Sequence, residues 1–242
     1  MSKLGQRFRT ALSWSLGLIA LIWSVYIVDT YLFREALRFD FGLWPRQPKG
    51  IWGIFTSPFF HGSWGHLLNN SFPFVTLSGF LIFFYPRLWP RIGAFLWIAT
   101  GMGAWIIAGG GVHIGASGVV FALAAFLAAS GVFRRDFRTI AVSLIVIFYY
   151  GSMFAGVLPG KEGISWESHL SGFILGIIGA WVFKDQLEDH EIEARRRKEQ
   201  RRLQAENSER AFLPDDAFQK TKVERQQEAF WNKLERDMGD SN

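Results

Sequence analysis

A serine flanked by small residues is the first candidate for chemistry in this sequence. Ser117 stands in the string Gly115-Ala116-Ser117-Gly118, which opens the apolar run 119–132. A nucleophilic hydroxyl must come close to the bond that it attacks, and small neighbours leave room for that approach. Small-residue strings also occur in transmembrane helices, where they only allow neighbouring backbones to pack closely. The string is therefore either the site of an acyl-transfer nucleophile or a packing face.

A histidine in a second glycine-bearing segment is the candidate base. His169 is followed by Gly172 and Gly176, which form a GxxxG face that favours close helix packing. The run after Ser117 also has small residues at helical spacing, at positions 118, 122, 125 and 129, which could pack against that face. A serine hydroxyl needs its base within about 2.6–3.2 Å. Two helices lined with small residues can approach closely enough for that distance, so we expect His169 to be the general base.

Three further polar residues belong to one segment: His61, His66 and Asn70. His66 and Asn70 are four residues apart, so on a helix they share one face and can donate to one oxygen. Histidines on two helices can also bind zinc. However, the sequence has no HExxH spacing, no carboxylates beside these residues and no cysteine. We therefore expect neither a metal site nor a cofactor, and a thiolate nucleophile is excluded.

The elements that carry these residues are predicted to be membrane-spanning helices. Half of the residues are hydrophobic. The chain has 11 tryptophans and 24 phenylalanines, an aromatic content that is high for a soluble protein. About 18 apolar residues suffice to cross a bilayer as a helix, and the sequence has six such stretches, at about 11–28, 64–84, 92–108, 117–133, 139–157 and 166–183. The first also resembles a signal peptide. It is too long for a typical signal core and no small-residue cleavage site follows it, so we expect an uncleaved span.

Charges in the connecting segments predict the orientation of these helices. Basic residues cluster before the first span and at 87–91, 134–138 and 195–197, whereas the connections around His113 and Lys161 are poorer in them. Cytoplasmic loops carry the excess of Lys and Arg, so we expect both termini in the cytoplasm. The 30–63 connection is an exception to the rule, because this orientation places its four basic residues on the outer side of the membrane. Ser117 and the start of the sixth span then lie near the outer face.

Polar residues inside spans are costly, so each is a candidate site residue. The second, fourth and sixth spans all carry polar residues towards their predicted outer ends, and packing alone explains this convergence poorly. Segment 30–63 differs, because charges and prolines interrupt it while aromatic residues remain dense. That mixture is typical of amphipathic pieces at the membrane interface. An ordinary extracellular loop is the alternative.

The chain changes character after Lys184. Residues 1–183 hold 13 Lys/Arg and 6 Asp/Glu, a net charge of +7. Residues 184–242 hold 13 Lys/Arg and 15 Asp/Glu, a net charge of −2. The basic excess thus belongs to the hydrophobic part, where it indicates membrane orientation and not a nucleic-acid partner. We expect a transmembrane domain at 1–183 and a charged cytoplasmic tail at 184–242, partly helical or disordered. The tail either contacts a cytoplasmic partner or is a solvated segment without a specific role.

Taken together, these features resemble the rhomboid family of intramembrane serine proteases. The resemblance covers about residues 11–183. It is carried by three motifs in this order, His61-x4-His66-x3-Asn70, Gly115-Ala116-Ser117-Gly118 and His169-x2-Gly172-x3-Gly176. Each motif is weak alone, and their combination on these spans is specific. The implied fold is an all-α membrane protein, a six-transmembrane-helix rhomboid-like bundle with a membrane-embedded first loop, which Trp52 and Phe55 fit, and a cytoplasmic C-terminal tail.

The resemblance also implies a role for each motif residue. Ser117 is implied as the nucleophile and His169 as the general base of a dyad that lacks the usual carboxylate. His66, Asn70 and the backbone N–H of Ser117 are implied to form the oxyanion site. The residues implied to support this site are His61, Gly115, Gly118, Phe121, Gly172 and Gly176.

Two positions bear on how closely the family pattern is followed. Phe121 stands where the better-known bacterial pattern often has a tyrosine. Its ring can stack against His169 but offers no hydroxyl. Glu167 lies two residues before His169, which places it on another helical face. We therefore expect Glu167 to be an interfacial residue and not the third member of a triad.

The predicted activity is intramembrane serine endopeptidase action, in which Ser117 and His169 cleave transmembrane segments of client membrane proteins near the outer membrane face. The expected partners are these substrates and the lipid bilayer, and the expected location is a prokaryotic plasma membrane. Two rival functions belong to other classes. A catalytically silent rhomboid-like scaffold or quality-control factor would bind transmembrane clients, but the chain retains both dyad residues. A small transporter or channel would need a continuous polar path, and the polar residues stop near one side.

Overall fold

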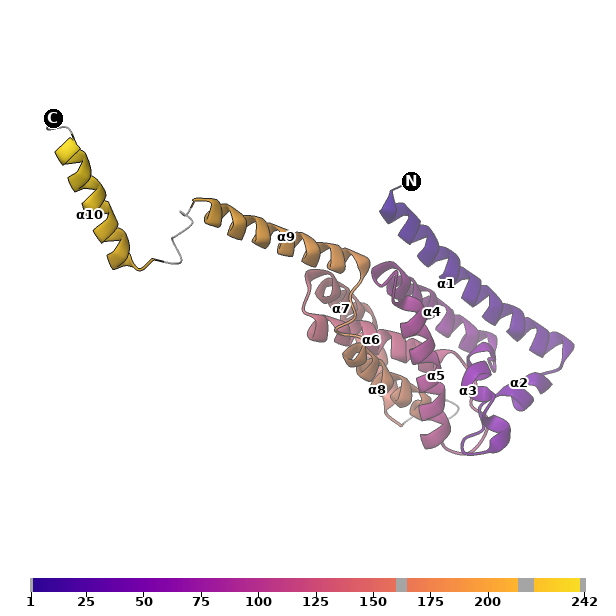
Figure 1. Cartoon of the computed structure of the whole chain (residues 1–242). Helices are drawn as coiled ribbons and strands as arrows, with labels where there is room; N and C mark the ends of the chain where they lie inside the picture. Colours follow the sequence, from indigo (N-terminus) through magenta and orange to yellow (C-terminus); the bar gives the residue numbers. More distant parts are fainter. Residues whose placement is uncertain (1, 160–164, 213–219, 240–242) are drawn as a thin grey trace. The chain divides into compact units, whose positions relative to one another are not determined.

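The computed structural model describes residues 2–159, 165–212 and 220–239. Within these ranges the regular structure is helical and contains no strand, with a single isolated bridge between two loops (Figure 1). The all-α prediction is therefore confirmed. The chain forms two compact units, Met1–Glu188 and Asp189–Asn242.

Five helical stretches of the first unit are long and apolar enough to cross a membrane. They are Leu4–Leu32, Trp64–Phe84, Trp89–Ile107, Ser117–Arg134 and Phe137–Val157. The sixth expected span forms the helix α8, Trp166–Val182, whose 17 residues are at the lower end of the length that a span needs. The count of six therefore stays a prediction.

The secondary-structure elements divide some of these stretches. The first stretch consists of α1 (Lys3–Ile27) and a π-helical turn, η1 (Val28–Leu32). The fifth consists of α7 (Phe137–Tyr150) and a 3₁₀ segment, η4 (Gly151–Val157). The other three are single helices: α4 (Trp64–Phe84), α5 (Trp89–Ile107) and α6 (Ser117–Arg134).

Local sequence explains where several helices begin. The side chain of Ser63 accepts a hydrogen bond from the backbone N–H of His66 and starts α4. Asp136 caps α7 by accepting from the backbone N–H groups of residues 138 and 139. Ser165 caps α8 in the same way. Ser and Asp are favoured at this position because their oxygens satisfy N–H groups that have no partner inside the helix.

Helix α6 is the centre of the first unit. It contacts α8, α7, α4 and α5, and Figure 1 shows it among these four helices. Most of its side chains are buried, and the apolar ones join a core to which α4 and α5 contribute Leu67, Phe74, Leu77 and Leu96. An apolar helix without a polar face is typical of a position surrounded by other helices. Ser117 therefore begins the most enclosed helix of the unit.

The segment between α1 and α4 folds into short helical pieces. These are α2 (Ala36–Phe41), η2 (Pro48–Gly50), α3 (Gly53–Thr56) and η3 (Ser57–Phe59). A buried ion pair holds the first of them, with Arg38 Nε 2.8 Å from the Asp29 carboxylate. The same carboxylate accepts from two backbone N–H groups at the start of α2. Several aromatic side chains of the segment remain exposed, among them Trp52 and Phe39.

The second unit contains two helices, α9 (Asp189–Phe212) and α10 (Lys222–Gly239). The side chains described in α10, from Lys222 to Arg236, are all exposed. In α9 those from Glu193 to Ser208 are exposed too.

Candidate active site

The approach of α6 and α8 determines the geometry of the candidate site. A Cβ atom added to Gly172 would lie 2.0 Å from the carbonyl oxygen of Gly118, and one added to Gly176 would lie 2.4 Å from that of Ala122. Only glycine at both positions of α8 permits this approach, because any side chain would overlap the backbone of α6. The two helix starts, with Ser117 and His169, are thereby brought side by side.

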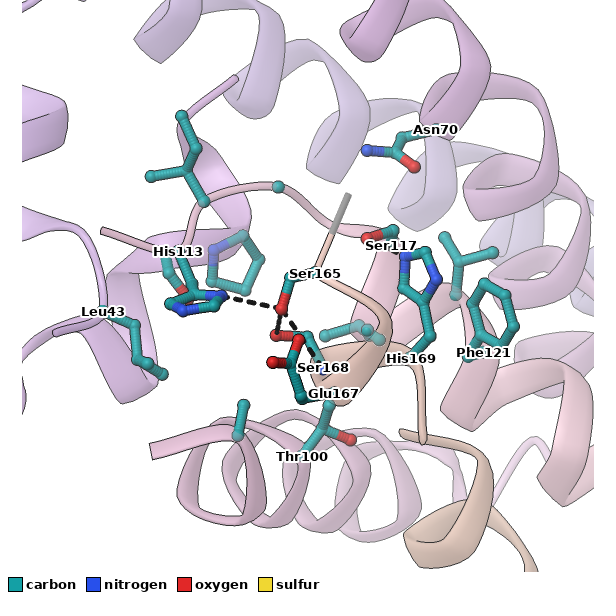
Figure 2. Close-up of a pocket in the computed structure, with 18 of the residues that line it drawn as sticks. Leu43, Asn70, Thr100, His113, Ser117, Phe121, Ser165, Glu167, Ser168 and His169 are labelled. Atoms are coloured by element: carbon teal, nitrogen blue, oxygen red, sulfur yellow. Dashed lines mark hydrogen bonds between the residues drawn. The ribbon is translucent and has the colours of Figure 1, made fainter. Parts of the chain in front are cut away.

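Ser117 and His169 form a hydrogen-bonded pair. The Oγ of Ser117 lies 2.8 Å from Nε2 of His169, and Figure 2 shows the two side chains together. The other ring nitrogen, Nδ1, lies 3.0 Å from the backbone carbonyl oxygen of Gly156. A carbonyl only accepts, so Nδ1 carries the proton and Nε2 is left to accept from the serine hydroxyl. This is the tautomer that a general base requires.

The imidazole of His169 is also held by packing. Phe121 stacks on it with ring centroids 4.2 Å apart and planes within 9°, as Figure 2 shows. Gly156 closes over the same pair, since a Cβ there would lie 3.0 Å from the ring of Phe121. Sequence reasoning missed Gly156 because its contribution is a backbone carbonyl, which no side-chain motif encodes. Its position in η4 is what brings that carbonyl to the histidine.

His66 and Asn70 lie over the loop that leads into α6. A Cβ added to Gly115 would lie 2.6 Å from Nε2 of His66 and 3.6 Å from Nδ2 of Asn70. Gly115 also has a φ of +113°, which strongly favours glycine. Two potential hydrogen-bond donors from α4 thus face the backbone two residues before Ser117. His66 and Asn70 are therefore placed against the loop that carries Ser117.

His61 links this donor pair to the loop. Its Nε2 lies 3.1 Å from Nδ2 of Asn70 and 3.5 Å from the backbone N of Ala116. Both partners are N–H donors, so the His61 nitrogen accepts and one N–H of the Asn70 amide stays available. Burial, followed by the neighbouring His66, lowers the pKa of His61, which keeps the ring neutral. His61 thus connects the Asn70 amide to the backbone just before Ser117.

A second hydrogen-bond network, which sequence reasoning missed, joins the loop before α6 to the first turn of α8. The Nδ1 of His113 lies 2.7 Å from Ser165 Oγ, and its Nε2 lies 3.1 Å from the carbonyl oxygen of Gly109. Ser165 Oγ is also 2.7 Å from Ser168 Oγ (Figure 2). The carboxylate of Glu167 accepts from the backbone N–H of Gly109, away from the dyad, which agrees with the expectation of no triad.

The segment between α1 and α4, here called the first-loop segment, also holds the loop that precedes α6. Leu43 and His113 exchange two backbone hydrogen bonds of 3.0 and 2.8 Å. The backbone N–H of Gly115 donates to the carbonyl of Ser57 at 3.0 Å. The string around Ser117 is therefore held between the first-loop segment and α8. This explains how a glycine-rich connection keeps one conformation.

The site opens into a cleft of about 1250 Å³. Its lining includes the dyad, the donor pair from α4, Phe121 and Met153. Among the described residues, no three His, Cys, Asp or Glu side chains are grouped so as to hold a metal ion. The chemistry that this arrangement can perform is nucleophilic attack by a serine paired with a base on a carbonyl in the cleft, whose lining also includes the potential donors His66 and Asn70.

Comparison with known proteins agrees with this arrangement. The family model described as Rhomboid domain matches residues 48–186. Two uncharacterized proteins, from Mycobacterium bovis and Mycobacterium tuberculosis, are each 35% identical over 179 residues, covering 69% of this chain and 72% of theirs. One from Mycobacterium leprae is 34% identical over 179 residues, covering 69% of each chain. The chain belongs to the rhomboid family, which confirms the resemblance. With its five apolar helices it is an integral membrane protein.

Proposed function

We propose that this protein is an intramembrane serine endopeptidase that cleaves transmembrane segments of client membrane proteins. The observation that carries the proposal is the 2.8 Å contact between Ser117 Oγ and His169 Nε2, with Nδ1 of the same ring held by the Gly156 carbonyl. A base that is both in reach and in the correct tautomer is what distinguishes a nucleophilic serine from a packing serine.

The reaction follows from the positions of these groups. Ser117 Oγ attacks the scissile carbonyl while His169 Nε2 takes its proton. The tetrahedral oxyanion accepts hydrogen bonds from His66, Asn70 and the backbone N–H of Ser117, each worth about 10²–10³ in rate when preset in a water-poor site. The imidazolium then protonates the leaving amine. Water, activated by His169, hydrolyses the acyl-enzyme and frees Ser117.

The substrate of this reaction must present an extended strand. A carbonyl inside a helix is already hydrogen-bonded and shielded, so a client transmembrane segment has to unwind locally before Ser117 can attack. We therefore propose that the preferred clients carry helix-weakening residues near the cleaved bond.

The proposal includes a topology. Six spans with both termini in the cytoplasm would place the dyad near the outer face, where water can reach the acyl-enzyme. A bacterial plasma membrane is the proposed location, which the mycobacterial relatives support. Residues 1–183 would form the protease domain and residues 184–242 the cytoplasmic tail.

The decisive test is cleavage of a labelled transmembrane substrate by the purified protein in detergent or proteoliposomes. Wild type should cleave, whereas Ser117→Ala and His169→Ala should not. Ser130→Ala is a matched control, because Ser130 lies on the same helix with its hydroxyl bonded to the Phe126 carbonyl, and it should cleave like wild type. Equal cleavage by wild type and Ser117→Ala would refute the protease assignment.

A serine-directed fluorophosphonate probe gives a second readout that needs no substrate. It should label Ser117 in the wild type and label the His169→Ala variant far more slowly. Labelling that does not depend on His169 would show that the serine is not activated. A folded protein that is neither labelled nor able to cleave any of several substrates would instead favour the catalytically silent scaffold.

A further inference from the structure

The residues that connect α8 to the tail, 183–188, are held on the side of the first unit opposite to the candidate active site. Arg134, at the end of α6, donates to the carbonyls of residues 183 and 186, just after α8. The buried carboxylate of Glu188 accepts from the backbone N–H groups of Arg87 and Leu88, just before α5. Ser117 lies at the other end of α6, about 27 Å away for a helix of 18 residues. The first unit therefore ends, at Glu188, on the side of the helical bundle away from Ser117.

Helix α9 carries a dense basic run soon after Glu188. Between residues 195 and 202 there are six basic side chains and one acidic side chain, and all of them are exposed. The basic residues are Arg195, Arg196, Arg197, Lys198, Arg201 and Arg202. A cluster of this size close to the end of a membrane span is complementary in charge to anionic lipid headgroups.

Helix α10 presents an apolar face that no described residue of its own unit covers. Val223, Phe230 and Leu234 fall on one side at helical spacing, with Trp231 beside them. Phe230 and Trp231 are 58% and 59% exposed, and their rings touch edge to face. An exposed aromatic pair on an amphipathic helix is typical of the boundary between headgroups and acyl chains.

We propose that the tail docks on the surface of the bilayer that the chain itself spans, with the basic run of α9 on anionic headgroups and the apolar face of α10 inserted at the interface. Lipid is favoured over a soluble partner for two reasons. The chain is anchored beside that surface, which raises its effective concentration there. The charge of the run matches anionic lipid. The proposal concerns a face remote from Ser117, so it does not depend on the protease assignment.

The absence of cysteine from the sequence makes a direct test simple. Gln227 lies on the apolar face, four residues after Val223 and three before Phe230, whereas Asn232 lies about 140° around the helix from Gln227. Each is replaced by cysteine in the full-length chain and labelled with the environment-sensitive fluorophore NBD. The two proteins are reconstituted singly in nanodiscs of phosphatidylcholine, with or without phosphatidylglycerol.

The expected result is a shift of the Gln227→Cys label to shorter wavelength, with several-fold less quenching by iodide, in the anionic nanodiscs. The Asn232→Cys label should change little. Replacing the first three arginines of the run by glutamine, or raising the ionic strength, should reverse the shift. Replacing Leu234 by Asp should abolish it, because the inserted face then carries a charge.

Three outcomes would overturn the proposal. Equal spectra for the two labels in anionic nanodiscs would mean that the apolar face does not enter the lipid. A fluorescence shift that is the same with and without phosphatidylglycerol, and the same after the arginine substitutions, would show that the basic run does not bind anionic lipid. A shift seen only when two copies share one bilayer, and not in single-copy nanodiscs, would show that a second chain covers α10.

Discussion

Gly172 is where the dependence of catalysis on helix packing can be tested most directly. In Gly172→Ala the new Cβ would lie 2.0 Å from the Gly118 carbonyl oxygen, whereas ordinary contact begins at 3.4 Å. Helix α8 must therefore retreat from α6 by about 1.4 Å, measured along that contact. His169 lies one turn before Gly172, and Gly118 directly follows Ser117, so the retreat separates the dyad.

The magnitude follows from the present distance. Ser117 Oγ and His169 Nε2 are 2.8 Å apart, and a retreat of this size takes them out of hydrogen-bond range. A misplacement of about 1 Å can cost about 10²-fold in rate. We expect kcat for the labelled substrate to fall about 100-fold with KM little changed. Overpacking should also cost about 1–3 kcal/mol of stability.

The assay combines cleavage kinetics, the rate of fluorophosphonate labelling and thermal unfolding in the same detergent. Gly93→Ala is the control, because a Cβ on Gly93 of α5 meets no atom within 4 Å, and it should match wild type in all three. Labelling should slow with kcat in Gly172→Ala, since both need the activated serine. If Gly172→Ala stays folded and keeps the wild-type kcat, close packing at Gly172 does not position the dyad.

Two further predictions concern other parts of the first unit. Asn70→Ala removes one donor beside Gly115 and should lower kcat about 100-fold, whereas a rise in KM alone would assign Asn70 to substrate binding. Asp136→Ala removes the N-cap of α7 and should lower stability by about 1 kcal/mol near neutral pH. Burial opposes the charge of Asp136, but hydrogen bonds from Thr139 and Arg138 outweigh it and lower its pKa. The wild type should therefore lose this stability as the pH falls below about 4, through the folded-state pKa, and the variant should not. Thermal unfolding against pH tests this.

The elements that sequence reasoning located well are those with strong local signals. Helix α4 begins and ends at the predicted residues because Ser63 caps it and Pro86 follows its end. The close contact of α6 and α8 was predicted from the spacing of Gly172 and Gly176, since the need for small residues at a helix crossing is visible as a periodic pattern.

The features that sequence reasoning missed depend on backbone geometry. Residues 139–157 were predicted as one helix, but the chain tightens to a 3₁₀ segment from Gly151, and apolar composition does not distinguish the two helix types. His113 lies in a glycine-rich connection without any periodic relation to Ser165, so their contact had no signal in the sequence.

The hydrogen bond from His169 to the Gly156 carbonyl has a consequence for how activity depends on acidity. In a triad the orienting carboxylate can itself be protonated, so acid disturbs both the base and the group that holds it. A backbone carbonyl has no such proton to gain. The hydrogen bond that holds the imidazole of His169 therefore has an acceptor that does not titrate, and it persists at low pH. No substitution at Gly156 removes this carbonyl, and an alanine there would instead place its Cβ 3.0 Å from the Phe121 ring that stacks on His169.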